Sequence, residues 1–266
     1  KHKEAKEEYM CLNFSLLIPK KEQSVIPGRY TYFEGEIALG KDIKLEEHAL
    51  TKVIKLSKDN LKFVFDHGRG RILWGEKELT TGLSVYTSVR SAGTWYDSYQ
   101  ADWKLTQKNK NRIKVCGYWP YIPISQVWQI ELIYKDSIHW KVDLDVYEEV
   151  DLEIEQANIM LSSEYKNWIV AGVSKGEFIN EYTRDYDILP FRFWYGIAKK
   201  REIGAVDTDF PSVLFKINSE EESFRAIVEN TDYLYKARLL QYQKCNSVKL
   251  LPKKYNSFEG VIKIDS

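Results

Sequence analysis

The stretch that decides the fold reads Val127-Trp128-Gln129-Ile130-Glu131-Leu132-Ile133-Tyr134, then Lys135-Asp136-Ser137, then Ile138-His139-Trp140-Lys141-Val142-Asp143-Leu144-Asp145-Val146. Apolar residues recur at every second position of both long runs, which is the period of a strand with one buried face. The three residues between the runs suit a turn, so the stretch predicts an antiparallel hairpin. Residues 150–155 keep the same period, and they predict a third strand that continues the hairpin as a meander.

Similar runs, bounded by Gly, Pro, Asn and Asp, occur along most of the chain. They predict further strands at 29–39, 61–65, 71–74, 83–90, 100–105, 191–198, 212–217, 224–229, 237–243 and 259–264. Helical character is confined to residues 1–8 and 45–50, and neither segment carries a long apolar stripe. Many strands without crossover helices predict an all-β fold, a large antiparallel two-sheet β-sandwich with very little helix.

The length of 266 residues fits one large β domain with an N-terminal extension. We expect residues 1–58 to form an extension and a hairpin packed on the sandwich, and residues 59–266 to form the β-sandwich domain. The pattern Pro-x-x-Tyr-x-x-Phe-Glu-Gly occurs at 27–35 and again at 252–260. This echo is either a coincidence or the mark of two related hairpins.

The charges argue against several classes of partner. There are 39 basic and 39 acidic residues, interspersed rather than grouped into the basic stripe that a phosphate backbone needs, so we expect no nucleic acid. No apolar run approaches the roughly 18 residues that would cross a bilayer, so we expect no transmembrane segment. Because the chain starts without Met, other domains of a longer parent chain count among the candidate partners.

The three cysteines, Cys11, Cys116 and Cys245, are few and widely spaced. This spacing argues against a disulfide framework and against a zinc knuckle, and it fits a reducing, cytoplasmic compartment. The chain also lacks the motifs of a phosphate loop, a nucleophile elbow, a zinc protease helix and a calcium loop. We therefore expect no cofactor and no metal.

Two aromatic clusters are candidates for ligand binding. The first contains Trp95 and Tyr96, with Arg90 nearby. The second contains Trp119 and Tyr121, in a segment where Pro120 and Pro123 forbid a central strand. Exposed rings beside polar groups suit sugars, because a pyranose presents apolar C–H faces and hydrogen-bonding hydroxyls. Each ring could instead belong to the sandwich core.

Catalysis would need acids and bases. Cleavage of a glycosidic bond requires two carboxylates roughly 5 to 10 Å apart, and Asp97, Asp102 and Glu131 are the candidates. His67 stands between Asp66 and a Gly-rich turn, where it could exchange protons or simply form the turn.

The pattern of strands and aromatic residues resembles the β-supersandwich of galactose-mutarotase-like domains. The likeness is carried by the Gly-rich turn within residues 63–74, by Leu79-Thr80, by the central strands and by the closing run 258–264. The resemblance implies a domain that binds or processes carbohydrates, as in mutarotases, epimerases, glycoside hydrolases and polysaccharide lyases. Mutarotases of that family use two histidines and a glutamate, and this sequence has no matching pair, so no catalytic residue is carried over.

Three hypotheses follow from the sequence. The first is a carbohydrate-recognising sandwich within a larger glycan-synthesising or glycan-degrading protein, with an oligosaccharide or polysaccharide as partner. The second is a glycoside hydrolase, lyase or sugar epimerase on the same scaffold, which a convergent pocket with two acids would favour. The third is a structural module that packs on a neighbouring domain, which a large apolar patch would favour.

Overall fold

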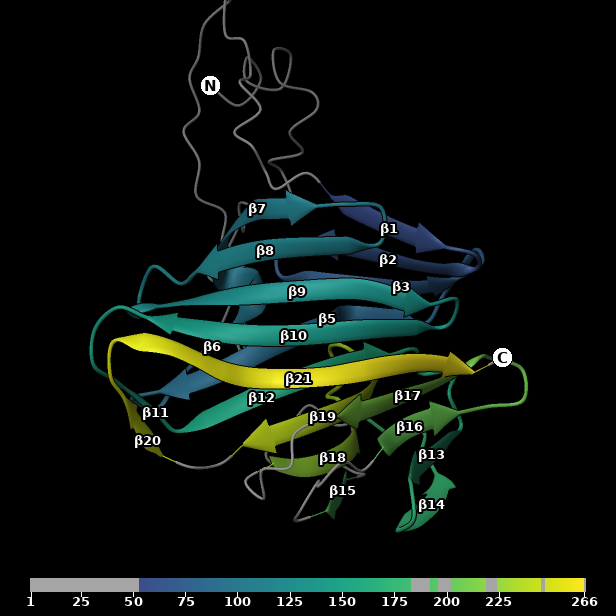
Figure 1. Cartoon of the computed structure of the whole chain (residues 1–266). Coiled ribbons are helices and arrows are strands. Elements are labelled where there is room, and N and C mark those ends of the chain that lie inside the picture. Colours follow the sequence, from purple (N-terminus) through teal and green to yellow (C-terminus); the bar gives the residue numbers. More distant parts are fainter. Residues whose placement is uncertain (1–52, 183–191, 196–201, 219–223, 245–246, 266) are drawn as a thin grey trace, which may run out of the picture. The chain divides into compact units, whose positions relative to one another are not determined.

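The computed structural model describes residues 53–182, 192–195, 202–218, 224–244 and 247–265 (Figure 1). They belong to a compact unit that begins at Leu50. Two large antiparallel sheets stack face to face, which confirms the predicted all-β sandwich. The strand predicted at 29–39, the helical segments and the first copy of the echo lie outside the described residues.

The ten-stranded sheet has the order β1-β2-β3-β5-β12-β19-β18-β15, with β4 paired to β3 and β6 paired to β5. Its strands are β1 (Ile54–Lys58), β2 (Leu61–Asp66), β3 (Arg69–Trp74), β4 (Lys77–Glu78), β5 (Thr80–Ser91), β6 (Thr94–Asp97), β12 (Ile154–Leu161), β15 (Arg192–Tyr195), β18 (Phe224–Asn230) and β19 (Arg238–Lys244). β1 pairs with β2 from Ile54 onward, so the sheet includes the last residues of the segment 1–58.

The nine-stranded sheet faces the viewer in Figure 1 and has the order β14-β13-β16-β17-β21-β10-β9-β8-β7. Its strands are β7 (Asp102–Lys108), β8 (Arg112–Tyr118), β9 (Ile124–Tyr134), β10 (Ser137–Val146), β13 (Asn167–Val170), β14 (Ser174–Glu177), β16 (Glu202–Val206), β17 (Ser212–Ile217) and β21 (Lys253–Asp265). β9 and β10 pair along their whole length, so the predicted hairpin is confirmed.

The predicted third strand of the meander is wrong. After β10 the chain forms the short β11 (Val150–Leu152), which pairs with β20 (Val248–Leu250), and then enters the ten-stranded sheet as β12. The place beside β10 is taken by β21 from the end of the chain. Alternating polarity shows that a segment is a half-buried strand, but it does not show which strand lies beside it.

Little helix occurs in the described ranges. A 3-10 turn, η2 (Ser98–Gln100), follows β6. No helix among these residues is long and apolar enough to cross a membrane.

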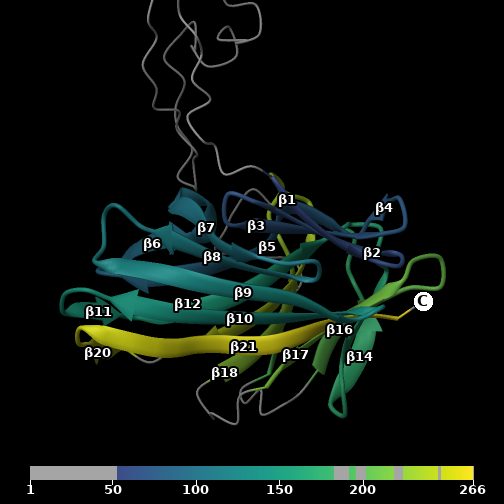
Figure 2. The ribbon, with the colours of Figure 1, turned by 45° about the horizontal axis from the view of Figure 1, so that its top comes forward.

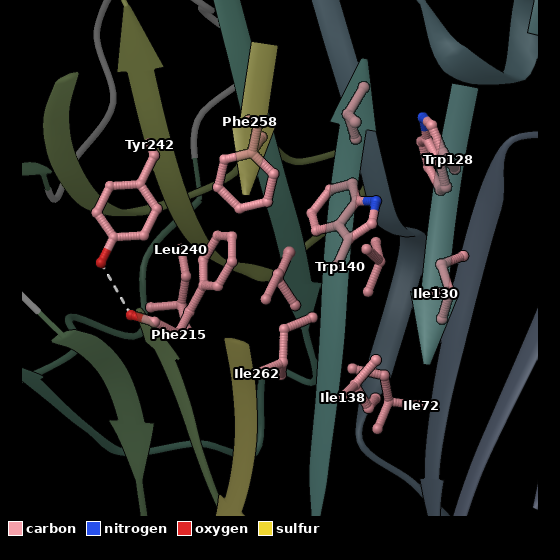
Figure 3. Close-up of a cluster of buried hydrophobic side chains, with 14 of the residues drawn as sticks. Ile72, Trp128, Ile130, Ile138, Trp140, Phe215, Leu240, Tyr242, Phe258 and Ile262 are labelled. Atoms are coloured by element: carbon pink, nitrogen blue, oxygen red, sulfur yellow. Dashed lines mark hydrogen bonds between the residues drawn. The ribbon is translucent and has the colours of Figure 1, made fainter. Parts of the chain in front are cut away.

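A chain of aromatic rings fills the space between the sheets. Trp128 lies 5.1 Å from both Trp103 and Trp140 between ring centroids, and Trp140 lies 5.0 Å from Phe258. Figure 3 shows Phe258 and Phe215 of the nine-stranded sheet beside Tyr242 of the other sheet, with Trp140 on the far side of the two phenylalanines. The Tyr242 hydroxyl donates a hydrogen bond to the Phe215 carbonyl at 2.9 Å. This pair ties the two sheets together and shows that Tyr242 points into the core.

The turn between β2 and β3 explains His67. His67 and Gly68 both have positive φ, 42° and 70°, as the tight turn of a two-residue hairpin requires. The Ser98 hydroxyl donates to the Gly68 carbonyl at 2.6 Å, and a Cβ on Gly68 would lie 2.2 Å from the Ser98 carbonyl oxygen. The His67 ring lies 2.8 Å from the Asp66 carboxylate. The residue therefore forms the turn, one of the two roles that its position allowed.

Candidate functional site

The outward face of the ten-stranded sheet carries the candidate site. Successive side chains of a strand point to opposite faces. Since Leu240 and Tyr242 point into the core (Figure 3), Gln241 between them points outward. Yet Gln241 is only 5% exposed, and its partner across the strands, Asn158, has no exposed area. The sheet is thus buried on both faces around β12 and β19 (behind β10 and β21 in Figure 2).

Polar side chains cross this outward face in two adjacent rows, which we call the polar band. The strand registers place one row across β6, β5, β12, β19 and β18, and the next row on β12 and β19. In order, the first row is Asp97, Ser88, Gln156, Gln243 and Arg225, and the second contains Asn158 and Gln241.

Hydrogen bonds join neighbours within the band. Gln156 Nε2 donates to Gln243 Oε1 at 2.9 Å, and Gln241 Nε2 donates to Asn158 Oδ1 at 2.6 Å. The Ser88 hydroxyl donates to Asp97 Oδ1, also at 2.6 Å. Asn158 Nδ2 is buried and has no acceptor among the residues that the structure describes. A buried donor without an acceptor costs about 1 to 3 kcal/mol, so this nitrogen is a strong point of attraction for an oxygen atom.

Tyrosine rings border the band. Tyr86 lies directly across from Asn158 and is 2% exposed. It belongs to a small apolar cluster with Met160 and Leu239, against which Tyr99 and Tyr235 pack. The outward face therefore combines an amide floor with aromatic and aliphatic walls.

Arg90 and Trp95 stand at the rim of this face, one step along the strands from Ser88 and Asp97. The Arg90 guanidinium lies 6.0 Å from the centre of the Trp95 ring, and its Nε lies 3.2 Å from the Glu153 carboxylate. Glu153 also accepts a hydrogen bond from the Gly93 amide at 2.8 Å. These contacts fix the guanidinium and the indole relative to each other.

Beyond the rim lies an open recess of about 590 Å³. Its lining comes from the turn after β5, from the segment around β11 and from the residue before β20. The lining residues are Ser91, Ala92, Glu149, Val150, Asp151, Glu153 and Ser247. Within the described ranges, no group of three or more His, Cys, Asp or Glu side chains is arranged to hold a metal ion.

An ion pair closes the far side of the outward face. Arg192 Nε lies 2.5 Å from Glu229 Oε2, and Glu229 is 6% exposed. Burial raises the pKa of the Glu229 carboxyl above its ordinary value, and the charge of Arg192 opposes the shift. Keeping the Glu229 carboxylate ionised in the folded protein therefore lowers the free energy of unfolding.

This raised pKa predicts a pH-dependent effect of Glu229→Gln. The folded protein binds the Glu229 proton more tightly than the unfolded chain, so the contribution of this group to stability falls as the pH rises through the two pKa values. Glutamine does not titrate, so the variant does not lose this contribution to stability as the pH rises. Its melting temperature relative to wild type, measured by circular dichroism, should therefore rise as the pH is raised above about 4, the ordinary pKa of a glutamate. A difference that stays constant over this range would contradict the assignment.

The structure separates the predicted aromatic residues into two groups. Trp95 is half-buried at the rim, and Tyr121 is 69% exposed on the loop between β8 and β9. Tyr96 packs against the core. Trp119 is 1% exposed, and its indole N–H donates to the Asp97 carbonyl at 2.9 Å. The expectation that Trp119 offers a stacking surface is therefore not met, because its ring is part of the core.

Two of the predicted acids, Asp102 and Glu131, are not brought together. Asp102 lies opposite Tyr118 and Glu131 lies opposite Arg112. These two β8 positions are about 20 Å apart at roughly 3.3 Å per residue, which is too far for a glycosidase pair. Asp97 lies in the polar band, buried and bonded to Ser88, while His67 lies in the β2–β3 turn.

The amides of the band were missed from the sequence. Gln156 and Asn158 stand two positions apart in β12, as do Gln241 and Gln243 in β19. Their alternation with Ala157 and Tyr242 resembles that of any strand with a solvated face. The signal that could have identified them is the presence of uncharged amides at strand positions where the other strands carry Lys, Asp and Glu.

Comparisons with known proteins do not show a family for this chain. No protein-family model matches the chain, and no curated protein matches it in sequence. Among solved structures, heparan sulfate lyase HepC from Pedobacter heparinus has 10% sequence identity and a TM-score of 0.48, covering 77% of this chain and 33% of that chain. The 4-alpha-glucanotransferase from Thermococcus litoralis has 9% identity and a TM-score of 0.49, covering 80% of this chain and 37% of that chain. The chain thus spans about a third of the length of these enzymes, and the resemblance to galactose-mutarotase-like domains stays a prediction.

Proposed function

We propose that this domain binds a carbohydrate on the outward face of the ten-stranded sheet. The observation that carries the proposal is the polar band, in which the half-buried Gln156 and Gln243 are hydrogen-bonded to each other at 2.9 Å. A sugar hydroxyl can accept a hydrogen bond from such an amide and donate its own hydrogen to an amide oxygen.

The chemistry of the band suits a sugar better than a charged or purely apolar ligand. Amides and hydroxyls both donate and accept, as sugar hydroxyls do, and the amides carry no net charge. The tyrosines beside the band offer apolar surface for C–H faces.

The rim extends this site toward solvent. Trp95 offers an aromatic face, and Arg90 is held next to it by Glu153. Arg90, Trp95 and Asp97, which the sequence singled out, thus lie along one edge of the band. In this proposal Trp95 stacks on the ligand and Arg90 orients its hydroxyls, while the buried Asp97 holds Ser88 in place beneath them.

The test is a glycan array probed with the wild-type domain and with Trp95→Ala. We expect saturable binding by the wild type and a loss of about fivefold or more in the variant, since an aromatic contact contributes about 1 kcal/mol or more. Tyr134→Ala is the matched control. Tyr134 is 67% exposed at the end of β9, at the other end of the sandwich, and its removal should change nothing.

Two outcomes would count against the proposal. A wild-type domain that binds no glycan on the array would refute carbohydrate recognition. Equal losses in Trp95→Ala and Tyr134→Ala would place the binding away from the outward face.

A further inference from the structure

Three exposed tyrosines lie at the end of the sandwich where β8 and β10 finish, at the left of Figure 1. Tyr118, Tyr121 and Tyr147 are 44%, 69% and 52% exposed. The rings of Tyr118 and Tyr147 have centroids 6.4 Å apart and are tilted by 55°. We call these three residues the tyrosine platform.

The backbone around the platform is held in place. The Tyr147 amide donates to the Pro123 carbonyl at 2.9 Å, and the Ile124 amide donates to the Ile122 carbonyl at 2.7 Å. The Tyr147 hydroxyl lies 2.6 Å from the Ser125 hydroxyl. A ring that is fixed before binding loses little conformational entropy when a ligand stacks on it, so Tyr147 and the adjoining Tyr118 are preorganised.

The platform adjoins the recess beyond the rim. Tyr147 precedes Glu149, a lining residue of the recess, by two positions, which is at most about 7 Å along the chain. Ser91 and Glu153 line the same recess, and they stand next to Arg90 in the sequence and in the ion pair. A ligand that stacks on Trp95 at the rim and crosses the recess would therefore reach Tyr147.

We propose that the tyrosine platform binds the extension of a glycan chain, so that the ligand is an oligosaccharide of several residues rather than a single sugar. This inference rests on the proposed function, because the polar band binds the first sugars of that chain. Tyrosine suits the role, since its ring stacks on C–H faces while its hydroxyl stays hydrated. The ligand class is a polysaccharide segment whose successive sugars expose apolar faces.

The experiment uses an array on which each oligosaccharide is printed as a length series from about two to about eight sugars. The wild-type domain should bind more tightly as the chain lengthens. In the double variant Tyr118→Ala with Tyr121→Ala, binding of the longest members should fall about tenfold, while binding of the shortest should not change. Both side chains are exposed, so the variant should melt like wild type. Tyr134→Ala serves again as the control.

The outcomes separate this inference from the proposed function. Wild-type binding that does not depend on length, or a double variant that keeps the gain with length, would overturn the platform and leave the polar band standing. Equal losses for short and long chains would also overturn it, because the tyrosines would then belong to the first site. If the wild type binds no member of any series, both proposals fail.

Discussion

Replacing Arg238 by methionine should lower the free energy of unfolding by about 3 kcal/mol or more. Arg238 is 2% exposed, and its guanidinium donates to the carbonyls of Ser163, Tyr165 and Ile179 and to the Asn230 side chain. Burial lowers the pKa of this guanidinium, but an arginine stays charged. Methionine fills similar space without donors, so several buried acceptors would lose their partner.

The measurement is urea unfolding followed by tryptophan fluorescence. The matched control is Arg71→Met, since Arg71 is an exposed arginine whose ion pair with Glu78 at 2.5 Å lies at the surface. Exposed pairs contribute about 0 to 1 kcal/mol, so the control should stay close to wild type. If Arg238→Met were as stable as Arg71→Met, the guanidinium would not be the anchor that we describe.

Much of the fold could be predicted because each strand is a local pattern. The alternation in 127–134 and 138–146 predicted a hairpin, and β9 and β10 form it. Pairing between distant segments could not be predicted in this way. The chain crosses between sheets after Val146, and β21 takes the place beside β10, because such contacts depend on the whole set of strands.

The candidate site could be predicted only at its edge. Arg90, Trp95 and Asp97 are close in sequence, and the hairpin of β5 and β6 also brings them close together in the fold. Their clustering could therefore be seen in the sequence. The pair Asn158 and Gln241 joins residues 83 positions apart, and only the register of β12 with β19 brings them together. An exposed Trp119 was predicted because Pro120 and Pro123 follow it in the sequence. Its ring instead packs in the core, and its indole N–H donates a hydrogen bond to the Asp97 carbonyl.

The double variant Gln156→Met with Gln243→Met should abolish carbohydrate binding while the fold persists. Each amide contacts the other, so replacing both by apolar side chains of similar size leaves no new unpaired group between them. Such paired replacements are nearly neutral, and we expect stability within about 1 kcal/mol of wild type. Binding should weaken by about 100-fold, because the ligand loses the amide floor at the centre of the site.

Two further variants make this result interpretable. Gln129→Met removes an amide on the nine-stranded sheet, where Gln129 contacts Arg112 and Asp143, and it should bind like wild type. Gln156→Met removes a half-buried amide of the polar band and provides a milder test should the double variant unfold. It should weaken binding without affecting the melting temperature.

The most direct test of the account is a calorimetric titration of the wild type and the Gln156→Met, Gln243→Met variant with the oligosaccharide that binds best on the array, next to their melting curves. The account predicts two similar melting curves and a Kd that rises by about 100-fold in the variant. A variant that melts like wild type and binds with an unchanged Kd would contradict it, because the polar band would then serve only to pack the sheet.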